Sequence, residues 1–301
     1  MMPFSTILML RIPKKHGRGY TLVELATVMT IITLIALTLV PRLSVQVDQQ
    51  HLKEDRILMS DAGKALRQFI TVNGRLPCPA IIGSNGFESF SVDPGPTYQI
   101  TCSANFGFLP ARSLGLSNLD ANGLLPNMWG RAINNPNNSF SLLYAVTDLS
   151  GAGVPASLNK ALMNIGATTN WALNGNRRSD IQTALNVTNP VNGTGISLCT
   201  AAVALAPSSL NCGAPGAVYL TDLVAVIISP GANGVGSPPP SIYETQNALI
   251  AGHLGRTFYQ LPYTGSPSGT GSSLNFDDTF EVVSFGDMLS QLSAGGWTFA
   301  P

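Results

Sequence analysis

The four cysteines are the residues of this chain whose chemistry is easiest to foresee. Cys78, Cys102, Cys199 and Cys212 are the cysteines among the 301 residues, and they allow three different pairings. An even number favours disulfide bonds in an exported protein. Closeness in sequence favours the pairs Cys78–Cys102 and Cys199–Cys212. Buried free thiols and a zinc site are the alternatives, but there is no C-x-x-C spacing and the histidines lie far from the cysteines in sequence.

The histidines and the paired acids give little support for catalysis. His51 falls on a predicted helix, and His253 lies in a Gly-His-Leu-Gly turn, where a surface position is the simpler interpretation. The Gly-x-Ser-x-Gly motif of hydrolases is absent. Asp277 and Asp278 are adjacent on an extended segment, so their side chains should point apart instead of forming a glycosidase pair. We therefore expect no enzymatic activity and no cofactor.

A calcium loop is the remaining chemical possibility in the polar turns. Asp120-Ala121-Asn122-Gly123 has oxygen ligands at alternate positions followed by glycine, but it lacks the closing glutamate of an EF-hand. An Asx-type turn is the preferred interpretation, and we expect no metal. Two further residues receive structural roles. We expect Arg75 to form a salt bridge between the head and the helix, and Trp129 to anchor the core or a turn.

A single carboxylate, Glu24, lies within the most apolar part of the chain. Residues 25–40 carry no charge, and with residues 20–23 they provide about twenty residues, enough to cross a bilayer as a helix. Basic residues and no acid precede this run, which places residues 1–19 in the cytoplasm. A cleaved secretory peptide would have a shorter apolar core. A plain anchor leaves Glu24 unexplained, because a carboxylate there costs about 2.5–3.5 kcal/mol.

The basic segment of residues 14–18, followed by Gly19, Tyr20 and then Glu24, resembles the type III signal of type IV pilins and type II secretion pseudopilins. The resemblance implies that a prepilin peptidase cleaves after Gly19 and methylates Tyr20. It also implies that Glu24 pairs with the N-terminal amine of a neighbouring subunit. The first mature residue is usually phenylalanine, and because tyrosine keeps the aromatic ring we expect cleavage to survive.

The resemblance also implies an α+β, pilin-like fold, with a long N-terminal transmembrane helix packed on an antiparallel β-sheet head. The expected domains are a prepilin leader (1–19), a transmembrane and stalk helix (20–72) and a β-rich extracytoplasmic head (73–301). The Leu-Pro-Cys-Pro segment (76–79) and the Trp-Gly turn (129–130) are also similar to pilin-like proteins. The size of the head favours a minor pilin or pseudopilin.

The expected function is that of a structural subunit of a type IV pilus or type II secretion filament. It implies an inner-membrane, single-pass protein with a periplasmic head, which later enters a filament. The expected partners are other pilin or pseudopilin subunits, the prepilin peptidase, the inner membrane and its assembly platform. A tip adhesin or ligand-binding module, and an anchored periplasmic enzyme, are the alternatives. Without the leader, twelve basic residues face sixteen acidic ones, so we expect no nucleic-acid partner.

Several elements must position these residues. A stripe of Leu52, Met59, Ala62, Leu66 and Phe69 has helical spacing and predicts packing of the helix on the head. Gly74 suits the left-handed cap after the last helical residue. Strands are predicted at 139–146, 196–206, 217–229 and 279–285, short helices at 155–165 and 179–186, and an amphipathic turn at 287–292.

Overall fold

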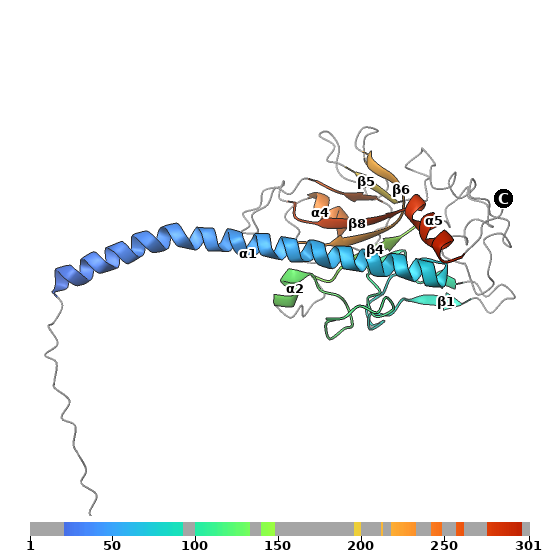
Figure 1. The fold of residues 1–301 in the computed structure, drawn as a ribbon, viewed down its shortest axis with the longest axis horizontal. Helices are drawn as coiled ribbons and strands as arrows, with labels where there is room; N and C mark the ends of the chain where they lie inside the picture. The colour runs from blue at the N-terminus through green and yellow to red at the C-terminus, as the bar shows by residue number, and fades with distance from the viewer. Residues whose placement is uncertain are drawn as a thin grey trace, which may run out of the picture. The chain divides into compact units, whose positions relative to one another are not determined.

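The computed structural model describes residues 21–92, 100–132, 140–147, 196–199, 212, 218–232, 242–248, 257–261 and 276–296. The contacts divide the chain into two compact units, residues 1–50 and residues 51–301. Figure 1 shows the helices and strands with the labels used below. Each unit is described by itself.

Helix α1 (Leu22–Asn73) begins in the first unit and ends in the second. The side chains of residues 22–35 are all exposed, and most of them are apolar. The hydroxyls of Thr27, Thr30 and Thr33 donate to backbone carbonyls three or four residues earlier. These hydroxyls are therefore satisfied within the helix, which leaves this part of α1 apolar around its whole circumference.

The described part of the chain contains no helix that is long and apolar enough to cross a membrane. The predicted transmembrane helix is therefore wrong. The predicted single-pass inner-membrane localisation with a periplasmic head is overturned by the same finding.

A curled mixed sheet forms the centre of the second unit. Its strands follow the spatial order β3 (Phe106–Phe108), β4 (Leu143–Val146), β6 (Val218–Ser229), β5 (Ile196–Cys199) and β7 (Thr257–Tyr259), and β8 (Thr279–Ser284) also pairs with β6. All pairs are antiparallel except β5 with β7, which run parallel. The predicted fold class, a transmembrane helix packed on an antiparallel sheet, is therefore wrong on both counts.

Short elements complete the second unit. Strands β1 (Phe90–Val92) and β2 (Ile100–Cys102) form a separate two-stranded antiparallel sheet. Among the described residues, the helices α2 (Met128–Ala132), α4 (Ile242–Asn247) and α5 (Phe285–Ala294) follow in chain order. Helix α5 begins with a capping box, in which the Ser284 side chain accepts from the Asp287 N–H and the Asp287 carboxylate accepts from the Ser284 N–H.

The first face of the sheet is covered by the second part of α1 and by α5 (Figure 1). Met59, Ala62, Leu66 and Ile70 are at most 3% exposed and recur every three or four residues, so they form one stripe. They pack in a single core with side chains of β4, β6, β8 and α5. Of the predicted stripe, Met59, Ala62 and Leu66 are buried as expected, whereas Leu52 and Phe69 are half-buried.

The opposite face of the sheet forms a second core. Leu143 and Ala145 of β4 point to this side, together with Val226 and Ile228 of β6 and Phe258 of β7. In β4 and β6, Tyr144, Val146, Ala225 and Ile227 point to the first core, as the alternation of a strand requires. Both faces of the central strands are therefore buried, which explains their nearly continuous apolar sequences.

Most of the predicted elements are found where the structure describes them. Strands β4, β5, β6 and β8 lie within the four predicted ranges, and α5 contains the predicted amphipathic turn. The predicted helices at 155–165 and 179–186 lie outside the described residues. Helix α1 ends at Asn73, and Gly74 follows with φ 66°, which confirms the predicted glycine cap.

Candidate functional site

The residues predicted to be processed and to direct assembly lie at the beginning of the chain. Gly19 and Tyr20 are outside the described residues. Glu24 lies in the first turn of α1, and its side chain is exposed. The Thr21 hydroxyl accepts the Glu24 backbone N–H at 3.3 Å, so Thr21 helps to satisfy the free N–H groups of the helix end.

Both predicted disulfides are confirmed. Cys78 is bonded to Cys102 with a Cα–Cα distance of 5.2 Å, and Cys199 to Cys212 with 5.4 Å. The first bond connects the segment after α1 to strand β2. The second fixes the end of β5 to a residue in the connection before β6. The described residues contain no free cysteine, so the thiol and zinc alternatives fail for all four.

Arg75 lies directly after α1 and forms a buried ion pair. Its guanidinium donates to both carboxylate oxygens of Glu88 at 2.7 Å, and both side chains are about nine-tenths buried. It also lies 5.2 Å from the centre of the Phe69 ring on α1. Arg75 therefore forms a salt bridge, but its partner Glu88 also follows α1, so the predicted bridge between head and helix is wrong; the contact of Arg75 with the helix is made through Phe69.

The other residues singled out by sequence have structural surroundings. Trp129 of α2 makes an edge contact with the ring of His51 at 5.7 Å, in keeping with an anchoring role. His253 lies outside the described residues. Asp120 Oδ1 accepts the N–H groups of Asn122 and Leu124 at 2.9 and 2.8 Å, which confirms the predicted Asx-type turn.

A cluster of three carboxylates, which the sequence did not suggest, lies beside β8. Glu244 of α4, Asp277 and Asp278 each offer one oxygen atom, and the three atoms lie within 4.8 Å of one another. The expectation that Asp277 and Asp278 point apart is therefore wrong. Both residues precede β8, which begins at Thr279, so the alternation of a regular strand does not apply to them.

The hydrogen bonds of this acidic cluster connect α4, β7 and the start of β8. The Asp277 N–H donates to Glu244 Oε1 and the Ala232 N–H donates to Asp277 Oδ2, both at 2.8 Å. The Asn247 amide donates to Asp278 Oδ2 and to the Tyr259 carbonyl, also at 2.8 Å. The cluster thus holds together segments that are more than thirty residues apart in sequence.

Burial favours the neutral form of Asp278 within this cluster. Asp278 is 9% exposed, and loss of solvation raises its pKa well above the usual value. Repulsion from the Glu244 carboxylate raises this pKa further, and Asp277 adds to it, whereas the hydrogen bond from Asn247 acts in the opposite direction. Three oxygens of this kind would suit a hard cation such as Ca²⁺. Because several of them already accept hydrogen bonds, we interpret the cluster as structural and assign no metal.

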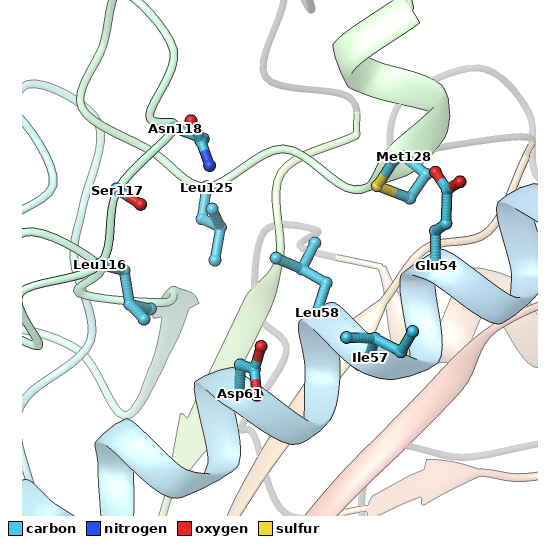
Figure 2. A pocket seen from close by; sticks show the side chains of 9 residues that line it. All are labelled: Glu54, Ile57, Leu58, Asp61, Leu116, Ser117, Asn118, Leu125 and Met128. Carbon is cyan, nitrogen blue, oxygen red and sulfur yellow. The ribbon is translucent and has the colours of Figure 1, made fainter.

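A pocket of about 370 Å³ lies between the second part of α1 and the segment that leads to α2 (Figure 2). Its lining is mainly aliphatic, with two carboxylates contributed by α1 and one asparagine. None of the residues lining it is aromatic. It therefore does not correspond to the Asn-rich and aromatic groove that an adhesive head would favour.

Comparisons of the chain with protein-family models, with curated proteins and with solved structures find no significant match.

Proposed function

We propose that this chain is a structural subunit of a type IV pilus or type II secretion filament, either a minor pilin or a pseudopilin. In this proposal a prepilin peptidase cleaves after Gly19, and the subunit assembles with other subunits through the first part of α1. The proposal concerns processing and assembly. It does not depend on an antiparallel head.

The observation that carries the proposal is the exposed apolar surface of residues 22–35. Leu22 is 85% exposed, Leu34 61% and Met29 60%, and apolar residues occur on all sides of the helix. A helix that is apolar all round is stable in water only when other apolar groups surround it. Burying one such side chain contributes about 1.5–3 kcal/mol. Packing of this segment among the same segments of other subunits would bury the whole circumference.

Glu24 supplies the specificity of this packing. A carboxylate in the first turn is favoured by the helix dipole, but it needs a cationic partner once the surrounding surface is buried. Cleavage after Gly19 would create a new amine at Tyr20, only four residues away in sequence. A neighbouring subunit shifted along the helix axis could bring this amine to Glu24. The sequence around Gly19 supports the proposal because it resembles the signal that prepilin peptidases cleave.

The proposal is tested by expressing the full chain in cells with an active prepilin peptidase and analysing sheared filaments and washed membranes by peptide mass spectrometry. We expect a peptide that begins at Tyr20. Glu24→Gln should still be cleaved but should lose most of its incorporation into filaments. Asp287→Asn is a matched control, because it removes one carboxylate from the start of α5 while the asparagine oxygen can still accept the Ser284 hydrogen bonds.

Two results would contradict the proposal. An uncleaved Arg18-Gly19-Tyr20 junction in every fraction would show that the proposed cleavage after Gly19 does not occur. Incorporation of Glu24→Gln at the wild-type level would remove the role given to this carboxylate. The filament in which the Tyr20 peptide is found would distinguish a surface pilus from a secretion pseudopilus.

A further inference from the structure

The two disulfide bonds lie in different surroundings. Cys199 and Cys212 are 0% and 3% exposed, and they share a small core with Tyr259. Cys78 is 1% exposed, whereas Cys102 is half-buried. Thiol–disulfide exchange requires a thiolate to reach one of the two sulfur atoms, so access decides which bond reacts. The bond between Cys78 and Cys102 is therefore the one that a thiol in solution can attack.

The backbone around each bond adds to this difference. Cys199 ends β5, which lies between β6 and β7 in the six-stranded sheet, and its carbonyl accepts the Gln260 N–H at 2.8 Å. Cys102 ends β2, which pairs with β1 in a two-stranded sheet, and the next residue, Ser103, is exposed. A strand end at the surface opens at a much smaller cost in free energy than the centre of a sheet does. Local motion therefore exposes Cys102 while Cys199 stays covered.

We propose that Cys102 is the site at which a dithiol in solution attacks this chain. The thiolate of the dithiol bonds to Cys102 Sγ while the bond between Cys78 and Cys102 breaks, and Cys78 leaves as a thiolate that takes up a proton from water. The second thiol of the reagent then displaces Cys102, so both cysteines are reduced and the dithiol is oxidised to a disulfide. This inference concerns the second unit alone and is independent of the proposed role in a filament.

Reduction of this bond releases a short part of the chain and leaves the central sheet intact. The bond joins β2 to the segment after α1, and neither of its cysteines belongs to the six-stranded sheet. The region of β1 keeps other attachments, because the Ser89 N–H donates to the Pro79 carbonyl at 3.2 Å and Glu88 is paired with Arg75. Strand β2 then depends on its pairing with β1. The bond thus acts as a redox-sensitive attachment of β2.

A neighbouring aromatic residue limits access to Cys102. Phe90 of β1 is directly opposite Cys102 in the antiparallel pair, so the two side chains lie on the same face of the two-stranded sheet. Phe90 is 39% exposed, and its ring centre lies 5.8 Å from the Arg75 guanidinium carbon. Shortening this side chain should therefore speed the attack on Cys102. Phe87 is 49% exposed and precedes β1, so it provides a matched control.

The test is differential alkylation of the folded full chain, followed by peptide mass spectrometry. The chain is treated with dithiothreitol without denaturant and alkylated with iodoacetamide, then denatured, reduced again and alkylated with N-ethylmaleimide. We expect iodoacetamide to label Cys78 and Cys102 about tenfold faster than Cys199 and Cys212, since access limits the exchange. Far-UV circular dichroism during the reaction should stay unchanged, because the central sheet is retained. Equal labelling of the two pairs, faster labelling of the second pair, or no labelling at all would overturn the inference.

A monothiol identifies the sulfur that is attacked. Reduced glutathione has no second thiol, so it should remain on Cys102 as a mixed disulfide while iodoacetamide labels Cys78. Glutathione found on Cys78 instead would contradict the assigned direction. Phe90→Ala should raise the rate of labelling severalfold, and Phe87→Ala should leave it unchanged. The experiments on the unmodified chain give a result even if Phe90→Ala fails to fold.

Discussion

The two parts of helix α1 use apolar residues in opposite ways. In residues 22–35 they occur around the whole helix and are exposed, whereas in residues 51–73 most of them lie in one stripe on the core side, and Ile57 and Val72 are exposed. The difference lies in the distribution of side chains around the axis, since both parts have the same backbone structure. The apolar stripe of the second part is buried by other segments of the same chain. The side chains of the first part are exposed in the described chain, and under the proposed function other subunits would cover them.

The acidic residues of the two parts of α1 also differ in their burial. Glu24 is exposed, whereas Asp55 is fully buried and its Oδ2 atom accepts the Thr279 hydroxyl at 3.1 Å. A buried carboxylate must have partners in the folded chain, and Asp55 finds one at the start of β8. The burial and hydrogen bond of Asp55 give it a structural role in the folded chain, whereas the exposure of Glu24 agrees with the assembly role proposed for it.

The largest expected effect compares one leucine from each part. Leu66→Ala should lower the free energy of unfolding by about 2–5 kcal/mol, because Leu66 is fully buried in the core between α1 and the sheet. Leu34→Ala should change it by less than about 0.5 kcal/mol, because Leu34 is 61% exposed. Urea denaturation followed by circular dichroism measures both. Similar losses for the two variants would show that residues 22–35 are packed within the isolated chain.

A smaller effect concerns the contact of α1 with β8. A Cβ atom on Gly63 would lie 2.6 Å from Glu281 Oε1, and Glu281 is paired with Arg67 at 2.9 Å. Gly63→Ala should therefore displace Glu281 and destabilise the chain by about 1 kcal/mol, even though alanine favours a helix. The same substitution in a Glu281→Ala background should stabilise by about 0.5–1 kcal/mol. The sign change in this double-mutant cycle is the critical result, and a stabilising Gly63→Ala in the unmodified chain would contradict it.

The sequence is sufficient to predict features that depend on local spacing. The buried stripe of α1, the cap at Gly74 and the disulfide between Cys199 and Cys212 all follow from residues close together in the chain. The long apolar run that became β6 was equally clear. In each case one periodicity or one short separation decides the structure, so no knowledge of the remaining chain is needed.

Features that depend on distant segments could not be predicted in this way. The antiparallel sheet was expected from the resemblance to pilins, and the parallel pairing of β5 with β7 leaves no mark on the apolar pattern of either strand that could have corrected this expectation. The approach of Glu244 to Asp277 and Asp278 depends on how α4 is placed beside β8. Asn247, which bonds both Tyr259 and Asp278, connects these segments. Its sequence neighbourhood alone does not indicate those partners.

The smallest expected effect, a pH dependence, sharpens the contrast between exposed and buried carboxylates. Burial raises the pKa of Asp278, and Glu244 raises it further, so the folded chain holds this carboxyl in its neutral form over a wider pH range than the unfolded chain does. Its contribution to stability is therefore complete below the unfolded pKa and is lost as the pH rises through the folded pKa.

Asp278→Asn keeps an acceptor for Asn247 and cannot ionise. It should stabilise the chain at pH 7 by about 1 kcal/mol, which is the usual cost of one buried polar group that is poorly matched by its surroundings. Its effect should be smaller near pH 4. Urea unfolding at the two pH values tests this, and an equal effect of Asp278→Asn at both would mean that Asp278 does not ionise differently in the folded and unfolded chains.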